Sequence, residues 1–226
     1  MITIARIHSD FPAKFGIPRQ AGLVPELRAQ VVFEPPFRNP DAVRGLAGFS
    51  HLWLIWEFSA AVRPDGQGWS PMVRPPRLGG ETRMGVFATR SPFRPNPIGL
   101  SSVRLLQVEY DPRLGPVLHV GGADLMDGTP ILDIKPYVAD DVHPDARFGF
   151  TTANQRHRLQ VEIPDDLLAG IPTDKRDALR GLLAEDPRPA YQDDPGRLYG
   201  LSFAGLNVRF SVAGGSLVVR SVDPLD

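Results

Sequence analysis

The chain has 226 residues, of which 42% are hydrophobic and 23% are charged, and its formal net charge is -1. This length and composition predict one sizeable core with room for a small second domain, while the near-zero net charge gives no global sign of a nucleic-acid partner. The chain contains 0 cysteines, which excludes disulfides, thiolate metal sites and cysteine nucleophiles.

Several further classes of protein are disfavoured by sequence pattern. We find no apolar run of about 18 residues and no signal-peptide pattern after Met1, so we expect a cytoplasmic protein without a membrane span. The histidines show no HxxxH or HExxH spacing, so we expect no metal. No GxGxxG or GxxxxGK motif signals a Rossmann or P-loop site.

Short β-type runs fill the first two thirds of the chain. They are rich in β-branched and aromatic residues and are separated by proline and glycine. These runs are residues 2–7, 29–34, 51–58, 85–90, 100–110, 117–122 and 131–138. Only residues 39–49 are predicted to be helical there, with Asn39 or Asp41 as the N-cap. Many strands with almost no helix predict a mainly β fold, a single-sheet antiparallel β-barrel, in a domain of residues 1–150.

The composition changes after Phe150. Residues 171–186 predict a helix with Thr173 as the N-cap. Its apolar face would carry Ala178, Leu179, Leu182 and Leu183. Residues 198–222 predict strands that turn at Gly214-Gly215. Residues 151–226 are therefore expected to form a small α+β domain.

A proline-rich loop, SPFRPNP at residues 91–97, joins two of the predicted strands. Pro92, Pro95 and Pro97 fix φ and push the preceding residues toward extended backbone, so the loop is stiff. It is either a loop ordered in advance for a ligand or a stiff barrel corner whose arginines face solvent.

Positive charge gathers around this loop, although the whole chain is slightly acidic. The arginines between residues 63 and 94 are Arg63, Arg74, Arg77, Arg83, Arg90 and Arg94, against Asp65 and Glu81. Guanidinium groups suit phosphates, and Trp69 and Phe93 offer stacking surface for unpaired bases. The cluster favours a nucleic-acid partner; the alternative is that arginine is simply common throughout the chain.

Five blocks, in order along the chain, resemble the TsaA-like (TrmO) family of tRNA adenine N6-methyltransferases. They are GIPRQAGLV (16–24), NPDAVRGLAGFSHLWLIWEF (39–58), VRPPRLGGETRMGVFATRSPFRPNPIGLS (73–101), DLMDGTPILDIKPY (124–137) and LAEDPRPAYQ (183–192). The resemblance implies a β-barrel that binds S-adenosylmethionine outside the Rossmann class and acts as a homodimer. It further implies methylation of N6 of threonylcarbamoyladenosine, next to the anticodon of threonine tRNA, with the anticodon stem-loop as partner.

The resemblance also implies a set of site residues. For the cofactor these are Gln20, Ala21, Gly22, Ser59, Ala60, Arg90, Leu100, Asp124, Leu125, Met126 and Asp127. For the substrate they are Arg94, Asn96, Lys135, Tyr137 and Arg188. A sulfonium cation favours nearby carboxylates such as Asp124, and a methionyl carboxylate favours an arginine such as Arg90. Asp127 has a second interpretation, as part of a DG turn.

The sequence departs from the family at Ser59-Ala60, where members commonly carry a histidine followed by a polar residue. His51 opens an apolar strand and is not assigned a catalytic role, so the proton acceptor stays unknown.

Three functions stay open at this point: the tRNA methyltransferase, a related enzyme that methylates another nucleic acid or a small molecule, and a non-catalytic module that binds S-adenosylmethionine or RNA. We expect the C-terminal domain to lie against the barrel and help hold the anticodon stem-loop. On that view, cofactor binding would survive deletion of the residues after about Thr151.

Overall fold

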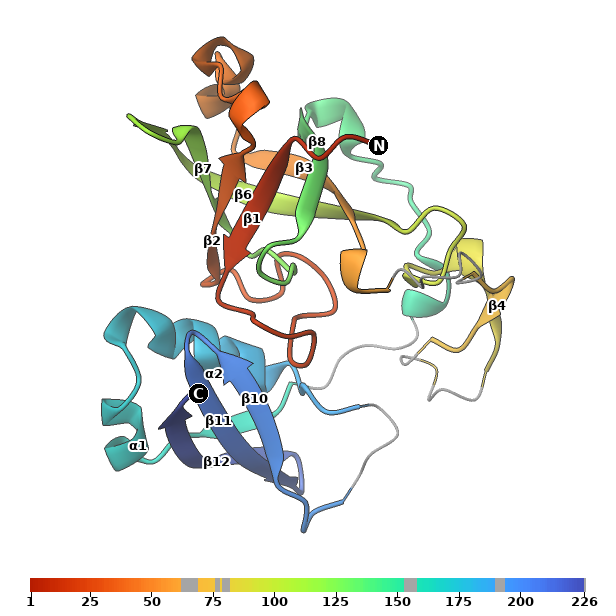
Figure 1. The fold of residues 1–226 in the computed structure, drawn as a ribbon. Coiled ribbons are helices and arrows are strands. Elements are labelled where there is room, and N and C mark those ends of the chain that lie inside the picture. Colours follow the sequence, from red (N-terminus) through yellow and green to blue (C-terminus); the bar gives the residue numbers. More distant parts are fainter. Residues whose placement is uncertain (62–68, 76–77, 79–81, 153–157, 190–193, 226) are drawn as a thin grey trace.

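The computed structural model describes residues 1–61, 69–75, 78, 82–152, 158–189 and 194–225. The chain forms a β-barrel with a smaller module of helices and strands beside it (Figure 1). The mainly β fold with a small C-terminal α+β region is the one that the sequence predicts.

Six strands close the barrel in the order β1-β2-β7-β6-β3-β8, and every neighbouring pair is antiparallel. The strands are β1 (Ala5–Ser9), β2 (Arg28–Phe33), β3 (His51–Glu57), β6 (Ile98–Asp111), β7 (Gly115–Gly121) and β8 (Pro130–Pro136). Closure leaves no unpaired edge in this sheet, which explains how a barrel with little helical cover is stable.

Alternation along the strands fills the barrel interior. In β3, Leu52, Leu54 and Trp56 point inward and are buried, while the residues between them are partly exposed. Together with Ile7 on β1 and Leu118 on β7 they belong to one hydrophobic cluster. This period of two is the signal that locates the strand in the sequence.

Two local predictions are wrong. Residues 85–90 do not form a barrel strand: β5 (Met84–Gly85) pairs with β4 (Met72–Val73), and Val86–Ala88 form a 3-10 turn. Val86 is buried and anchors this turn. Because a buried β-branched residue is also typical of a strand, the sequence of this turn resembles that of a strand.

Residues 39–49 form two 3-10 turns, Pro40–Val43 and Leu46–Gly48, instead of one helix. Gly45 separates them with a φ of 85°. The predicted cap is present, because the side chain of Asn39 accepts a hydrogen bond from the Asp41 N–H at 3.0 Å.

The C-terminal module is a four-stranded sheet with two helices. Its strands lie in the order β10-β11-β12-β9, where β9 is parallel to β12. The elements are β9 (Gln160–Glu162), α1 (Asp165–Ala169), α2 (Arg176–Ala184), β10 (Tyr199–Phe203), β11 (Leu206–Ala213) and β12 (Ser216–Pro224).

Two predictions for this module are confirmed and one is wrong. Gly214 and Gly215 form the turn between β11 and β12, both with positive φ. The four predicted apolar residues of α2 are buried. Thr173, however, is not the N-cap, since a 3-10 turn over Thr173–Lys175 precedes α2 and places Lys175 at that position.

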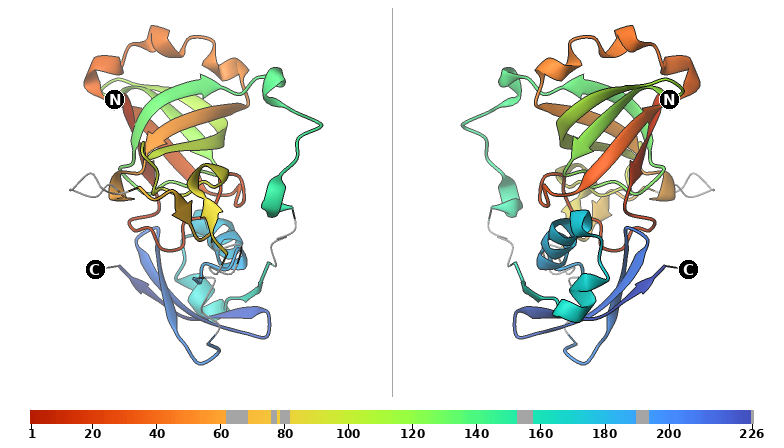
Figure 2. Two further views of the ribbon diagram at one scale, coloured as in Figure 1. Left: turned by 90° about the vertical axis from the view of Figure 1, so that its right-hand side faces the viewer. Right: turned by 90° about the vertical axis from the view of Figure 1, so that its left-hand side faces the viewer.

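The barrel and the module have separate hydrophobic clusters, but one segment of the barrel part belongs to the module's cluster. Phe11, Val24 and Leu27, which lie between β1 and β2, pack with residues of α2, β10, β11 and β12. Both views in Figure 2 show this segment between the barrel and α2. The boundary at residue 150 stays a prediction, and this contact crosses it. No helix in the described part of the chain has the length and apolar character needed to cross a membrane.

Candidate functional site

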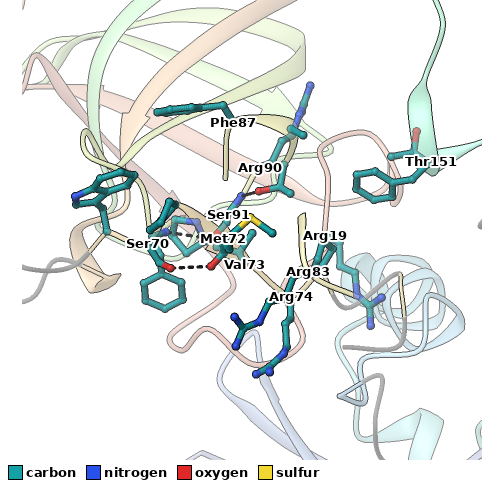
Figure 3. A pocket seen from close by; sticks show the side chains of 18 of the residues that line it. Arg19, Ser70, Met72, Val73, Arg74, Arg83, Phe87, Arg90, Ser91 and Thr151 are labelled. Carbon is teal, nitrogen blue, oxygen red and sulfur yellow. Dashed lines mark hydrogen bonds between the residues drawn. The ribbon is translucent and has the colours of Figure 1, made fainter. Parts of the chain in front are cut away.

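Two neighbouring cavities open between the barrel and the segments that flank it. The inner cavity has a volume of about 500 Å³, and Trp56, Leu100 and Asp124 are among its walls. The outer cavity has a volume of about 1240 Å³ and is lined by arginines and aromatic side chains (Figure 3). Arg19, Thr89, Arg90 and Pro92 line both, so the two cavities adjoin each other.

A buried polar chain reaches the wall of the inner cavity. The Trp56 Nε1–H donates to Ser101 Oγ at 3.0 Å, and the Ser101 hydroxyl donates to Asp124 Oδ1 at 2.6 Å. Burial raises the pKa of the Asp124 carboxyl above its ordinary value. The Ser101 hydrogen bond, a backbone hydrogen bond from Ala21 and the charge of Arg90 oppose that shift. Asp124 is thus a carboxyl group whose ionised form would gain from a cation in the cavity.

Strand pairing explains why this chain of groups forms. Trp56 of β3 lies opposite Gly99 of β6, and Leu54 lies opposite Ser101. A side chain at Gly99 would collide with Trp56, since an added Cβ would lie 2.2 Å from the indole Cε2. Gly99 therefore gives room to an indole ring of the protein itself, and this close approach accounts for the glycine without a ligand.

Seven of the predicted cofactor residues line the inner cavity. They are Ser59, Ala60, Arg90, Leu100, Asp124, Leu125 and Met126. Lys14, another wall residue of the inner cavity, donates from its ammonium group to the backbone carbonyl of Ala60.

The remaining predicted cofactor residues lie close by. Gln20 lines the outer cavity. The Ala21 backbone contacts Asp124, and the Gly22 N–H donates to the Gly122 carbonyl at 2.8 Å. Asp127 accepts from the Ser9 N–H at 3.0 Å and lies 3.4 Å from His8 Nδ1, which agrees with its interpretation as a turn residue.

The outer cavity combines cationic and aromatic walls. Arg74 and Arg83 are exposed and extend to the same side of it in Figure 3, while Phe87 lies on the opposite side beside Arg90. The guanidinium groups of Arg74 and Arg83 make no hydrogen bond or ion pair with any residue that the structure describes. Two arginines of the predicted cluster, Arg63 and Arg77, lie outside the described residues.

The proline-rich loop uses Arg94 to hold its own shape. Arg94 Nη1 donates to the carbonyls of Thr89 at 3.0 Å and Ser91 at 3.2 Å, and its guanidinium lies 5.9 Å from the Phe87 ring centre. The same arginine lines the inner cavity. Asn96 is exposed and is not among the described residues that line either cavity.

Within the part of the chain that the structure describes, the other predicted substrate residues do not line either cavity, although the Arg188 carbonyl accepts from Arg19, a wall residue, at 3.4 Å. Lys135 pairs with Asp133 at 2.9 Å on β8, and Tyr137 packs against Trp53 with a ring distance of 5.4 Å. Arg188 forms a bidentate pair with Asp186, at 2.8 Å and 2.9 Å. The structure does not bring these three residues to either cavity of the described chain, and their substrate role stays a prediction.

Sequence reasoning misses Trp56, Ser101 and Lys14 as parts of the site. Trp56 and Ser101 lie in strand patterns that indicate core residues, and their link to Asp124 depends on strand register. No local signal in the sequence reports that register.

The geometry limits what the site can bind. A cavity of this size with an acidic group, a guanidinium and aromatic and apolar walls suits a small molecule that carries both charges. The adjoining cavity suits a polyanion with unpaired bases. Within the described ranges, no three His, Asp or Glu side chains are grouped as metal ligands would be.

Comparison with known proteins matches both parts of the chain to one family. Residues 6–141 match the model of the tRNA-methyltransferase O N-terminal domain, and residues 156–225 match that of the TrmO C-terminal domain. A protein of Escherichia coli (strain K12) named tRNA (adenine(37)-N6)-methyltransferase is 41% identical over 231 residues, covering 98% of this chain and 96% of its own.

Other relatives give the same result. A protein of the same name from Eikenella corrodens is 46% identical and covers 77% of this chain and 97% of its own. The crystal structure of TrmO from Pseudomonas aeruginosa superposes with a TM-score of 0.78 at 35% identity, covering 98% of this chain and 95% of its own.

Proposed function

The chain belongs to the tRNA-methyltransferase O family, and from this premise we propose that it methylates N6 of adenosine 37 of tRNA with S-adenosylmethionine. The observation that carries the proposal is the pair of adjoining cavities. One offers a buried carboxyl group and a guanidinium, and the other offers arginines and aromatic rings.

The inner cavity fits S-adenosylmethionine by chemistry and by size. Small-molecule pockets have volumes of roughly 300–1,000 Å³, a range that includes this cavity. The Asp124 carboxylate would face a cationic group of the cofactor, and Arg90 its carboxylate. Trp56, Phe58 and Leu100 supply apolar surface for the adenosyl part. When bound, the cofactor supplies an electrophilic methyl group.

The outer cavity is the proposed place of the anticodon loop. Arg19, Arg74 and Arg83 would contact phosphates, and Phe87 and Trp69 would stack on unpaired bases. Arg90, which lines both cavities, marks the place where the acceptor base would meet the cofactor. Phe87 is 74% exposed, so its ring would be accessible to a base beside the Arg94 guanidinium that lies over it.

We further propose that the adenosine carries a threonylcarbamoyl group. Acylation makes the N6 proton more acidic than that of plain adenine, so its removal needs only a modest acceptor. The protein's contribution is then to exclude water and to align the acceptor nitrogen, which can supply a large part of a rate enhancement. No residue is assigned as the base.

We also propose that the protein is a homodimer and that it is located in the cytoplasm. Leu106 and Tyr110 are exposed large side chains on β6, which is consistent with a protein interface. Sedimentation of the wild-type protein and of Leu106→Glu tests the dimer, and cell fractionation tests the compartment. A wild-type protein that sediments as a monomer at micromolar concentration would refute the dimer.

Mass spectrometry of anticodon-loop nucleosides tests the function. We expect tRNA from a deletion strain to lack N6-methylated threonylcarbamoyladenosine, and the purified protein to restore it in the presence of S-adenosylmethionine and a chelator. Threonine tRNA without the threonylcarbamoyl group serves as the control substrate. An unchanged nucleoside profile in the deletion strain would refute the proposed function.

A further inference from the structure

The stretch between β1 and β2, residues 10–27, lies between the barrel and the C-terminal module, and we refer to it as the β1–β2 segment. One side of it packs into the module. Phe11, Val24 and Leu27 are buried there, and the Phe11 ring centre lies 5.5 Å from that of Phe203. The segment is thus part of the module's core, although it belongs to the barrel in sequence.

Polar contacts fix the same side of the segment. Lys175 Nζ donates to Asp10 Oδ2 at 2.6 Å, and both side chains are mostly buried. The Ala204 N–H donates to the Asp10 carbonyl at 2.9 Å. Gly16 has a φ of 87°, and an added Cβ would lie 2.0 Å from Leu201 Cδ1, so the backbone lies directly on β10.

The other side of the segment forms a wall of the inner cavity. Lys14, Ile17, Pro18 and Arg19 line that cavity. Ala21 makes the backbone contact with Asp124, and the neighbouring Gly22 is held by the Gly122 carbonyl. Any shift of the segment away from the module would therefore change the shape of this cavity.

We propose that the C-terminal module positions the cofactor cavity, with Lys175 and Asp10 as the positioning residues that hold the β1–β2 segment in place. The segment has no helix or strand of its own, and its buried apolar residues Phe11, Val24 and Leu27 belong to the module's cluster. A loop that is ordered before binding loses less conformational entropy when a ligand binds. The module thus raises cofactor affinity without touching the cofactor.

The test uses the full-length protein with Lys175→Met, which removes the charge and keeps the length of the side chain. Arg209→Met is the matched control, since Arg209 is an exposed basic residue of the same module. Hydrogen exchange reports the order of residues 10–27, calorimetry reports S-adenosylmethionine affinity, and a filter assay reports tRNA affinity. All are measured well below the melting temperature of each variant.

We expect Lys175→Met to speed exchange in residues 10–27 and to weaken S-adenosylmethionine binding by about tenfold, the size associated with one hydrogen bond to a charged group. Affinity for tRNA should fall by less than cofactor affinity, because Arg74 and Arg83 of the outer cavity lie outside the segment. The exchanged pair Asp10→Lys with Lys175→Asp should recover part of the cofactor affinity, which a loss of general stability would not. Lys175→Gln carries the same test if Lys175→Met does not fold.

Two results would overturn the proposal. One is faster exchange in the segment with unchanged cofactor affinity, and the other is a loss of tRNA affinity with cofactor binding intact. The inference rests on the proposed cofactor, but different results refute the inference and the proposed function. A wild-type protein that does not bind S-adenosylmethionine would refute the proposed function. The exchange measurement would still show whether the module orders the segment.

Discussion

Asp124 is the ionisable residue whose environment bears most directly on binding. Burial raises its pKa, so the folded protein holds the proton of this carboxyl to higher pH than the unfolded chain does. Its contribution to stability is complete below the ordinary value of 3.8 and is lost as the pH rises through the folded pKa. Ionisation of this buried carboxyl therefore costs free energy, and a cation bound beside it would lower that cost.

This environment predicts a pH-dependent cofactor affinity. S-Adenosylmethionine should bind more tightly as the pH rises through the pKa of Asp124, because the ionised carboxylate attracts a cation. Asp124→Asn, which keeps the acceptor for Ser101, should bind more weakly and lose this dependence. Calorimetry from the lowest pH at which the protein is folded up to about pH 8, the end of the range in which proteins are usually most stable, gives the comparison. Parallel curves for both proteins would contradict the role of Asp124.

We expect substitution of Gly99 to lower the stability of the barrel. Gly99→Ala would push the added methyl group into the Trp56 indole, which is held by Ser101. We expect a loss of about 1–3 kcal/mol in the free energy of unfolding, as for other overpacked cores. Gly48→Ala is the control, since an added Cβ there meets nothing within 4 Å. Equal denaturant midpoints for the two variants would show that the added methyl group beside Trp56 does not lower the free energy of unfolding.

Among the elements, the strands are predictable from sequence and the site is predictable only in part. β3 and β6 carry a clear alternation of buried and exposed side chains, because each presents one face to a closed core. The turn at Gly214-Gly215 is predictable because both positions need positive φ. Residues 85–90 resemble a strand in the sequence because Val86 and Phe87 are apolar, yet Phe87 is exposed.

The site depends on contacts that local pattern does not encode. Asp124 is identified only through resemblance to a family, and its partners Ser101 and Trp56 are not identified at all. The substrate role of Arg94 stays a prediction, but the sequence does not indicate that its guanidinium donates to the carbonyls of Thr89 and Ser91. A stiff loop still needs donors for its carbonyl groups when prolines supply none, and Arg94 fills that need.

Arg74 and Arg83 lie on one small element, and their positive charges lead us to predict salt-dependent RNA binding. Both flank the small β4–β5 pair and are exposed in the outer cavity. Arg74→Gln with Arg83→Gln should weaken tRNA binding and reduce its salt dependence. The slope of log affinity against log salt should fall by about 0.7 for each phosphate that the variant no longer neutralises. Cofactor affinity should not change.

Arg113→Gln, at the distant turn between β6 and β7, is the control for those two substitutions. A double variant with the same tRNA affinity and salt slope as this control would show that the outer cavity does not bind the RNA backbone.

At the scale of the whole molecule, the β1–β2 segment shares a hydrophobic core with the C-terminal module, and this determines the expected effect of deleting the module. The sequence alone predicts that cofactor binding survives deletion of the residues after Thr151. The structure favours the opposite result, because deletion would expose Phe11, Val24 and Leu27, each worth roughly 1.5–3 kcal/mol when buried.

We therefore expect a chain of residues 1–151 to melt at a lower temperature than the full protein and to bind S-adenosylmethionine weakly or not at all. Scanning calorimetry and isothermal titration on the two proteins check this. A truncated chain that matches the full protein in both measurements would show that the β1–β2 segment orders itself on the barrel alone.

The contact between Phe11 and Phe203 also has a consequence for how the enzyme is made. The ribosome completes all six barrel strands before β10 emerges, so a nascent chain can close its barrel while residues 10–27 still lack the surface that buries them. The cofactor cavity then becomes complete only after almost the entire message has been translated. A chain cut short near its end would resemble the finished enzyme in its barrel and differ from it in activity.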